Sequence, residues 1–296
     1  MKPGVLIKPE VARPAPHVVV EKLVKRYGDR TVLHGLDLVL DRAETLVIIG
    51  GSGAGKSTLV RHLIALERPT SGRIVIGGVD VSALSEVDLA RERRRFGMVF
   101  QKYALFDSMT CFDNVAFPLR EQTKLSERDI RDKAMTKLKE LGVDHAATLT
   151  PAEISGGMAK RVGIARALVM EPELLIYDEP TSGLDPVTSR TVDALIDEMR
   201  ERFGVTSVVI THDMVSAFDI ADQMAMLIKG KVVAQGPPAE VLVHPDPDVQ
   251  AFIKASGVSA ARFELRTGRT PSRELADKAM VRRAEVAEAE KAAKGS

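Results

Sequence analysis

Tryptophan is absent from this 296-residue chain, and aromatic residues of all kinds make up only 4% of it. An excess of one charge is also lacking, because 42 Lys and Arg residues stand against 41 Asp and Glu residues, for a net charge of +1. Nucleic-acid-binding domains carry a clear basic excess, so we do not expect nucleic acid as a partner. Hydrophobic residues make up 45% of the chain, which is enough for a sizeable core.

Cysteine occurs once, as Cys111, so no disulfide can form within the chain, which suits a reducing cytoplasm. No apolar run approaches the roughly 18 residues that a membrane-spanning helix needs. Residues 1–16 contain four prolines and no apolar segment of the kind found in a secretory signal, so we expect an extended lead-in there. Any membrane role is therefore expected to come through a partner.

Between residues 17 and 257, short apolar runs alternate with helical patterns and glycine-rich turns, which predicts an α/β fold. The runs Leu46–Ile49 and Leu174–Ile176 are apolar without interruption, as is typical of buried parallel strands. The stretch from about 104 to 170 is mostly helical by pattern and lies between two strands, which predicts an inserted helical subdomain. The strands that we expect are Val18–Val24, Thr45–Ile49, Gly97–Phe100, Leu174–Tyr177, Ser207–Ile210, Met224–Ile228 and Lys231–Ala234.

Residues 258–296 differ in composition and are rich in Ala, Glu, Lys and Arg. Thr270-Pro271 would begin a helix well, but the apolar stripe of Leu275, Ala279 and Val286 is too thin for the segment to fold alone. We expect a helical or partly disordered tail that docks on a second copy of the chain or on a small partner.

A glycine-rich segment at residues 50–58 fits the phosphate-loop pattern G-x-x-x-x-G-K-[ST] and lies between a buried strand and a helical pattern. Glycines let backbone N–H groups turn toward phosphates, and the helix N-terminus favours anions. We expect Lys56 to place its ammonium at the β- and γ-phosphates of ATP, and Ser57 to offer its hydroxyl to Mg²⁺. The ATP-binding residues expected in this loop are Gly50, Gly51, Ser52, Gly53, Ala54, Gly55, Lys56, Ser57 and Thr58.

Two carboxylates, Asp178 and Glu179, follow the apolar run Leu174–Tyr177. Asp178 is the candidate that reaches Mg²⁺, usually through water. Because strand side chains alternate, Glu179 is expected to point elsewhere and to act as the general base that holds the attacking water in line with the γ-phosphate. Alone, such a strand end is more often a cap. Together with the phosphate loop it predicts a site that hydrolyses a nucleotide.

Further segments occur in the order of a known family. Ile154-Ser155-Gly156-Gly157-Met158, before an Arg- and Ala-rich helix, resembles the signature motif of ABC ATPases. The run from Asp178 to Asp185 resembles their Walker B motif and D-loop, and Thr211-His212-Asp213 resembles their switch-histidine loop. Gln101 resembles the glutamine of the Q-loop, and Tyr27 stands where the family has the aromatic residue that stacks on adenine.

The resemblance covers about residues 17–255 and implies a P-loop NTPase core with a mostly parallel sheet, an N-terminal antiparallel β subdomain and the helical insertion. It also implies that two chains sandwich two ATP molecules head to tail, so that Ser155–Gly157 and Asp185 contact the ATP of the opposite subunit. His212 is implied to contact the γ-phosphate, and Gln101 to contact Mg²⁺ and the attacking water. Without the family pattern, the signature segment could be a plain loop and Tyr27 could be core packing.

The segments Ala104–Glu121, Ala217–Asp222 and Asp246–Ile253 resemble one branch of the family, the ATPases of Mla-type (maintenance of lipid asymmetry) phospholipid transport systems and their plastid relatives. Met158, where most ABC proteins have Gln, is also typical of that branch. The resemblance implies four partners: a transmembrane permease, a second copy of the chain, a small regulatory subunit and a lipid-binding shuttle protein. It also implies that the chain lies at the cytoplasmic face of the inner membrane, bound through the permease.

Three other functions can be compared with this pattern, and the last two fit it less well than the first. Importers of methionine or other polar amino acids share part of the pattern, so the chain could power a polar-solute importer. Non-transport ABC ATPases usually have two cassettes or a long coiled-coil insertion, and this chain has one cassette and no long heptad run. A P-loop kinase would lack the signature motif and the switch histidine.

Overall fold

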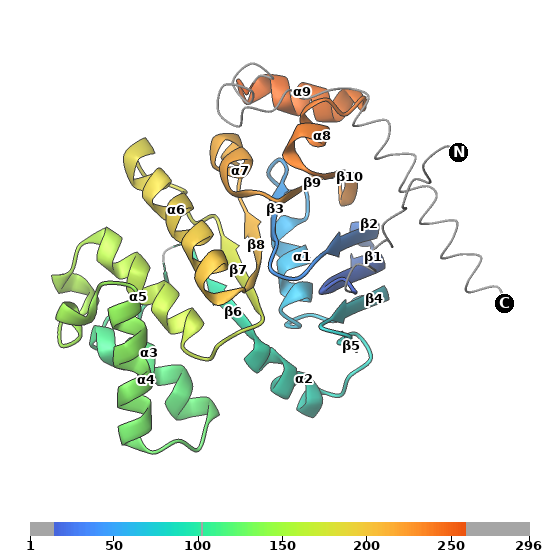
Figure 1. The fold of residues 1–296 in the computed structure, drawn as a ribbon. Helices are drawn as coiled ribbons and strands as arrows, with labels where there is room; N and C mark the ends of the chain where they lie inside the picture. Colours follow the sequence, from blue (N-terminus) through green and yellow to red (C-terminus); the bar gives the residue numbers. More distant parts are fainter. Residues whose placement is uncertain (1–14, 102, 259–296) are drawn as a thin grey trace, which may run out of the picture.

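Two sheets form the centre of the computed structural model, which describes residues 15–101 and 103–258 (Figure 1). A four-stranded antiparallel sheet has the order β2-β1-β4-β5, and a six-stranded sheet has the order β10-β9-β3-β8-β7-β6. In the larger sheet β10 is antiparallel to β9, and the other pairs are parallel. The strands are β1 Val18–Tyr27, β2 Arg30–Leu40, β3 Thr45–Ile49, β4 Ser71–Ile76, β5 Val79–Asp80, β6 Phe96–Val99, β7 Leu174–Asp178, β8 Thr206–Ile210, β9 Gln223–Ile228 and β10 Lys231–Gly236.

The predicted α/β architecture, with a mostly parallel sheet and an antiparallel β unit, is confirmed, and each of the seven expected strands is present within a few residues. The strands β2, β4 and β5 were not assigned from the sequence. The lead-in expected over 1–16 and the tail expected over 258–296 lie almost wholly outside the described residues.

The helices are α1 Lys56–Leu63, α2 Glu86–Glu92, α3 Cys111–Gln122, α4 Glu127–Glu140, α5 Gly156–Leu168, α6 Pro186–Phe203, α7 Met214–Ile220, α8 Pro238–Leu242 and α9 Pro247–Ala255, with short 3-10 helices at Arg93–Arg95, Asp144–Ala146 and Pro151–Glu153. Capping residues mark several ends. The Asp185 side chain accepts hydrogen bonds at the start of α6, and Gly204 ends that helix in a left-handed conformation. No helix of the described ranges combines the length and the apolar character that a membrane span requires.

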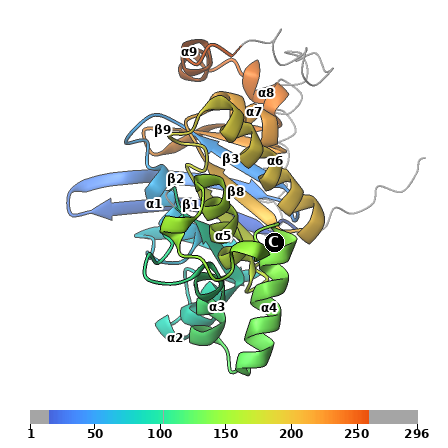
Figure 2. The same ribbon diagram turned by 90° about the vertical axis from the view of Figure 1, so that its left-hand side faces the viewer.

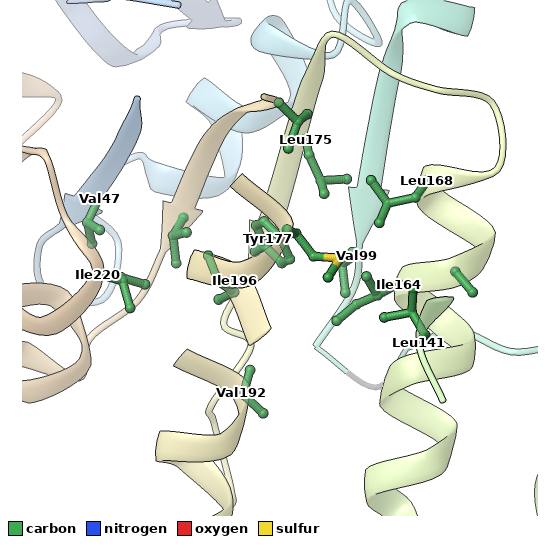
Figure 3. Close-up of a cluster of buried hydrophobic side chains, with 14 of the residues drawn as sticks. Val47, Val99, Leu141, Ile164, Leu168, Leu175, Tyr177, Val192, Ile196 and Ile220 are labelled. Carbon is green, nitrogen blue, oxygen red and sulfur yellow. The ribbon is translucent and has the colours of Figure 1, made fainter. Parts of the chain in front are cut away.

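Both faces of the six-stranded sheet are buried, as its uninterrupted apolar strands require. On β3, Val47 and Ile49 pack into a core with α3 to α7, and Leu46 and Ile48 pack into a second core with α1 and the antiparallel sheet. Figure 3 shows part of the first core, including Tyr177 between the sheet and the helices. The strands that lead to the loops of the site are therefore packed against side chains on both faces of the sheet.

A helical region formed by α3, α4 and α5 lies between β6 and β7 in the chain and projects from the sheet, away from α8 and α9 (Figures 1 and 2). The three helices contact one another pairwise. Two of them begin with the same device, because the Thr110 and Ser126 side chains accept hydrogen bonds from backbone N–H groups at the starts of α3 and α4. Ser155, which caps the start of α5, therefore belongs to this helical region and not to the loops that follow the strands of the sheet.

Candidate functional site

The glycine-rich loop connects the buried strand β3 to α1, as the sequence predicts. A side-chain carbon at Gly50 would lie 2.2 Å from the Leu227 carbonyl oxygen, so only glycine allows this close approach of loop and β9. Gly55 has φ +106° at the N-terminus of α1. The first backbone N–H groups of α1 are therefore turned toward the loop, where an anion can accept from them.

Lys56 is the first residue of α1 and folds back over the loop. Its Nζ donates to the Gly50 carbonyl oxygen at 2.7 Å and to the Gly51 carbonyl oxygen at 3.2 Å. The ammonium is thus held within the turn by two neutral acceptors. A phosphate is a stronger acceptor for an ammonium than a carbonyl group, so this lysine can transfer its hydrogen bonds to an anion in the loop.

A pocket of about 550 Å³ opens beside the loop. Its lining includes residues 52–58 of the loop and α1, Tyr27 and Arg30 of the β1–β2 hairpin, and Asp178 and Glu179 at the end of β7. Burial raises the pKa of Asp178, and the neighbouring Glu179 carboxylate raises it further, whereas Lys56 opposes the shift. A cation placed next to Asp178 would offset the cost of its charge.

Glu179 lines the pocket although it lies one residue beyond the end of β7. The prediction that strand alternation turns Glu179 away from Asp178 is wrong, because β7 ends at Asp178 and Glu179 has φ +50°, in the left-handed region. Its backbone N–H donates to the Ile210 carbonyl oxygen at 2.8 Å, which fixes this turn. Both carboxylates consequently line the same pocket.

His212 lies next to Glu179, with 2.7 Å between His212 Nδ1 and Glu179 Oε2. Gln101 Nε2 donates to Ser182 Oγ at 3.0 Å, three residues beyond Glu179. Tyr27 lines the pocket, and its hydroxyl donates a hydrogen bond to Glu67. The structure thus collects residues 52–58, Tyr27, Asp178 and Glu179 around one pocket, whereas Gly50 and Gly51 are not part of its lining. His212 is hydrogen-bonded to Glu179, and Gln101 is hydrogen-bonded to Ser182 in the segment that follows Glu179.

The signature segment and Asp185 are placed differently. Ser155 Oγ accepts from the Met158 N–H at 3.3 Å and caps α5, and Asp185 Oδ1 accepts from Val187 and Thr188 at 3.0 Å each and caps α6. Within the described ranges, neither Ser155–Gly157 nor Asp185 is part of the pocket lining. A single chain therefore does not bring these residues to the pocket beside its own glycine-rich loop.

Sequence reasoning missed Arg30, Val32 and Ile210 in the lining of the pocket. Arg30 pairs with Tyr27 across the β1–β2 hairpin. The dipeptide Gly28-Asp29 is a hairpin signal that could have indicated β2 and placed Arg30 opposite Tyr27. Glu67, the partner of the Tyr27 hydroxyl, has no sequence signal of its own.

Comparison with known proteins shows which proteins the chain is similar to. Residues 33–182 match the family described as ABC transporter. The chain is 38% identical over 247 residues to an intermembrane phospholipid transport system ATP-binding protein, MlaF, of Haemophilus influenzae, covering 83% of this chain and 94% of that protein. It is 40% identical over 236 residues to a probable ribonucleotide transport ATP-binding protein, mkl, of Mycobacterium tuberculosis, covering 80% of this chain and 66% of that protein.

Among solved structures, the chain is similar to a dimeric ATP-binding cassette, MJ0796, in a post-hydrolysis state bound to ADP and Pi. The TM-score is 0.66 with 31% identity, and the match covers 74% of this chain and 98% of that one.

Proposed function

The chain belongs to the ABC transporter family of ATPases, and we propose that it is the subunit whose ATP hydrolysis powers the movement of phospholipid between membranes. The ATPase part of this statement is carried by one observation, the convergence of the phosphate loop, Asp178 and Glu179 on one pocket. The phospholipid part is supported by the likeness to MlaF over most of both chains. The proposed catalytic domain spans residues 17–257, with the helical subdomain at about 104–170.

In the proposed mechanism, Tyr27 stacks on adenine and the loop residues 50–58 hold the phosphates. Lys56 leaves the carbonyl groups of Gly50 and Gly51 for the β- and γ-phosphates, where its charge offsets the charge that builds up during transfer. Glu179 takes up the proton of the attacking water. His212, which is hydrogen-bonded to Glu179 Oε2, orients that carboxylate and contacts the γ-phosphate.

Mg²⁺ fits the residues that surround the pocket. Ser57 and Asp178 both line it, and Asp178 is a carboxyl whose charge burial and Glu179 disfavour. Mg²⁺ in nucleotide sites is typically held by one or two protein oxygens together with substrate phosphates and water. Ser57 and Asp178 would hold the ion directly or through water, with Gln101 beside it, and the ion would neutralise charge on the phosphates.

The site is proposed to be composite. Ser155 to Gly157 and Asp185 stand at helix N-termini, where anions are favoured, yet they are not part of the pocket of their own chain. In a head-to-tail dimer these residues would contact the ATP held by the partner chain. The dimeric form of the similar cassette MJ0796 supports this arrangement. ATP would then hold the dimer closed, and hydrolysis would remove the bridge.

The proposed assembly contains two copies of this chain and a transmembrane permease, at the cytoplasmic face of the inner membrane. A small regulatory subunit and a lipid-binding shuttle protein are proposed as further components. The likeness to the mycobacterial relative named for ribonucleotide transport favours a polar solute as the second candidate cargo. Lipid and polar solute would be moved with the same ATP chemistry, so the cargo must be tested separately.

The test is to tag the full chain in its native cell, purify it from detergent-solubilised membranes and identify the proteins and small molecules that remain bound, by mass spectrometry. The expected result is a permease, a shuttle-type protein and phospholipid enriched over a control purification from cells that carry the untagged chain. An amino-acid- or nucleotide-type permease without enriched lipid would replace the phospholipid proposal by the second candidate. Recovery with ribosomes or DNA would contradict the transport function itself.

A further inference from the structure

Tyr27 is an exposed side chain with a defined orientation. It is the last residue of β1, directly before the turn at Gly28, and 43% of it is exposed. An exposed tyrosine samples several rotamers, and a ligand that needs one of them must order the ring when it binds. Here the ring is fixed before any ligand arrives, because its hydroxyl donates a hydrogen bond to Glu67.

Glu67 is itself held in place from several sides. Its backbone N–H donates to the Arg61 carbonyl oxygen at 3.1 Å, just after the end of α1. Its Oε1 accepts from Arg61 Nη1 at 3.1 Å, and its Oε2 lies 3.4 Å from Lys25 Nζ. A carboxylate that accepts from two cations and a phenol is positioned more strongly than one in a single exposed pair.

Lys25 contacts both Glu67 and the Tyr27 ring, and so links the two residues independently of the hydrogen bond between them. Its Nζ lies 5.0 Å from the centroid of the Tyr27 ring and donates to the Arg68 carbonyl oxygen at 2.8 Å. Lys25 is not among the residues that line the described pocket, whereas Tyr27 is. The cation therefore supports the ring without being part of the lining.

The hydrogen bond between Tyr27 and Glu67 persists at neutral pH. Burial and the Glu67 carboxylate raise the pKa of the Tyr27 phenol, so it stays protonated and donates. Burial alone would raise the pKa of Glu67, but hydrogen bonds from Tyr27, Arg61 and Lys25 hold it below its ordinary value, so it stays ionised and accepts.

We propose that Glu67 is a positioning residue for nucleotide binding, because its carboxylate holds the Tyr27 ring in the orientation on which the base stacks. The proposal rests on the proposed stacking of adenine on Tyr27. It adds that the affinity for the base is set at the C-terminal end of α1, through Arg61 and Glu67, while the phosphates are bound at the N-terminal end of the same helix. Base affinity and phosphate affinity can then be changed separately.

The experiment compares ADP with pyrophosphate, which lacks the base, by calorimetric titration of the full chain in the presence of Mg²⁺. The variants are Glu67→Ala, Glu67→Gln and Tyr27→Phe, with Glu86→Ala as the matched control. Glu86 is an exposed glutamate paired with Arg68 and Arg93 that does not contact Tyr27. Glu67→Gln keeps an acceptor for the phenol, and Tyr27→Phe keeps the ring but removes its donor.

The expected result is that Glu67→Ala and Tyr27→Phe each weaken ADP binding roughly two- to tenfold, the cost of ordering one side chain, and leave pyrophosphate binding unchanged. The double variant should be no weaker than the weaker single variant, because both changes remove one interaction. Glu67→Gln should restore most of the affinity, and GDP should lose affinity by the same factor, since stacking requires only the face of a base.

Equal losses for ADP and pyrophosphate in Glu67→Ala would overturn the proposal, because Glu67 would then act on the fold of α1. A normal ADP affinity in both Glu67→Ala and Tyr27→Phe would overturn it as well. Tyr27→Ala separates this failure from that of the proposed function. If Tyr27→Ala weakens ADP selectively and Glu67→Ala does not, stacking stands and the role of Glu67 fails. If Tyr27→Ala leaves both affinities unchanged, stacking itself is wrong and the role of Glu67 falls with it.

Discussion

His212 Nδ1 lies 2.7 Å from Glu179 Oε2, and the His212 backbone N–H is 3.4 Å from the same oxygen. The two residues meet because β7 and β8 are parallel neighbours in which Asp178 pairs with Ile210, so the loops that follow both strands leave the sheet at the same edge. The imidazole thereby restrains a carboxylate whose backbone is in the left-handed region. A carboxylate with a fixed direction is what a general base requires.

His212→Ala should lower the rate of ATP hydrolysis by about a hundredfold or more, because it removes the group that is proposed to orient the base and to contact the γ-phosphate. ADP affinity should change little. Steady-state hydrolysis at saturating ATP, together with ADP titration, measures both. Hydrolysis at the wild-type rate would show that the hydrogen bond to Glu179 has no part in the reaction.

Lys56→Ala should abolish measurable hydrolysis, since no other ammonium of the described pocket lining can take over the role that is proposed for Lys56 at the phosphates. Lys124, exposed in the loop between α3 and α4, provides the matched control. Lys124→Ala should hydrolyse ATP at the wild-type rate. Comparable activity in the two variants would remove Lys56 from the mechanism.

Ser155→Ala should lower hydrolysis strongly while ADP binding by the isolated chain stays near normal, because Ser155 is proposed to contact the partner's nucleotide. The substitution also removes the cap of α5, at a cost of about 1 kcal/mol. Ser126 caps α4 in the same way, because its Oγ accepts a hydrogen bond from the Asp129 N–H at 3.2 Å. The Ser126→Ala variant therefore controls for the loss of stability that removing a helix cap causes. Equal activity of the two variants would mean that Ser155 is only a cap.

Lys160 links stability to pH. It is 3% exposed, its Nζ lies 5.5 Å from the ring centroid of Tyr103, and no hydrogen-bond acceptor for it is found among residues 15–101 and 103–258. Burial lowers the pKa of Lys160 from 10.5 to about 8, against the opposing effect of Asp185 and Asp193. Between these pH values the unfolded chain binds more protons than the folded one, so this group makes stability rise with pH.

Lys160→Met should remove that dependence. The wild-type free energy of unfolding minus that of the variant should therefore increase from pH 7.5 to pH 10.5, by up to about 3 kcal/mol. Urea unfolding of both proteins at several pH values measures the difference. A difference that stays constant with pH would show that the Lys160 ammonium keeps its ordinary pKa in the folded protein.

Strands that are buried on both faces are easier to predict from the sequence than strands that are partly exposed. β3 and β7 are uninterrupted apolar runs and were found, whereas β2 alternates buried and exposed positions and contains Gly35 at φ +72°. β4 begins with exposed residues, and β5 has two residues. β2 and β4 are strands because they pair with β1, and β5 is one because it pairs with β4. Local sequence pattern does not encode these pairings.

The position of the loop from Gly50 to Thr58, between β3 and α1, was predictable because the motif depends on residue type at fixed spacing, and residues 52–58 of this loop line the pocket. The direction of Glu179 was not, because the left-handed turn that sets it depends on a hydrogen bond to Ile210, 31 residues further along the chain. The contact of Tyr27 with Glu67 likewise joins residues 40 positions apart. Such contacts follow from how the sheets and α1 pack, which sequence spacing does not reveal.

The most direct test of the composite ATPase site is one measurement on Glu179→Gln: molar mass by light scattering, with and without ATP and Mg²⁺, alongside the rate of hydrolysis of the same sample. The amide cannot accept the proton of the attacking water, so ATP should bind and persist between two chains. The account predicts a dimer that forms with ATP and a rate far below that of the wild type. A protein that remains monomeric with ATP and hydrolyses it at the wild-type rate would contradict both the role of Glu179 and the shared site.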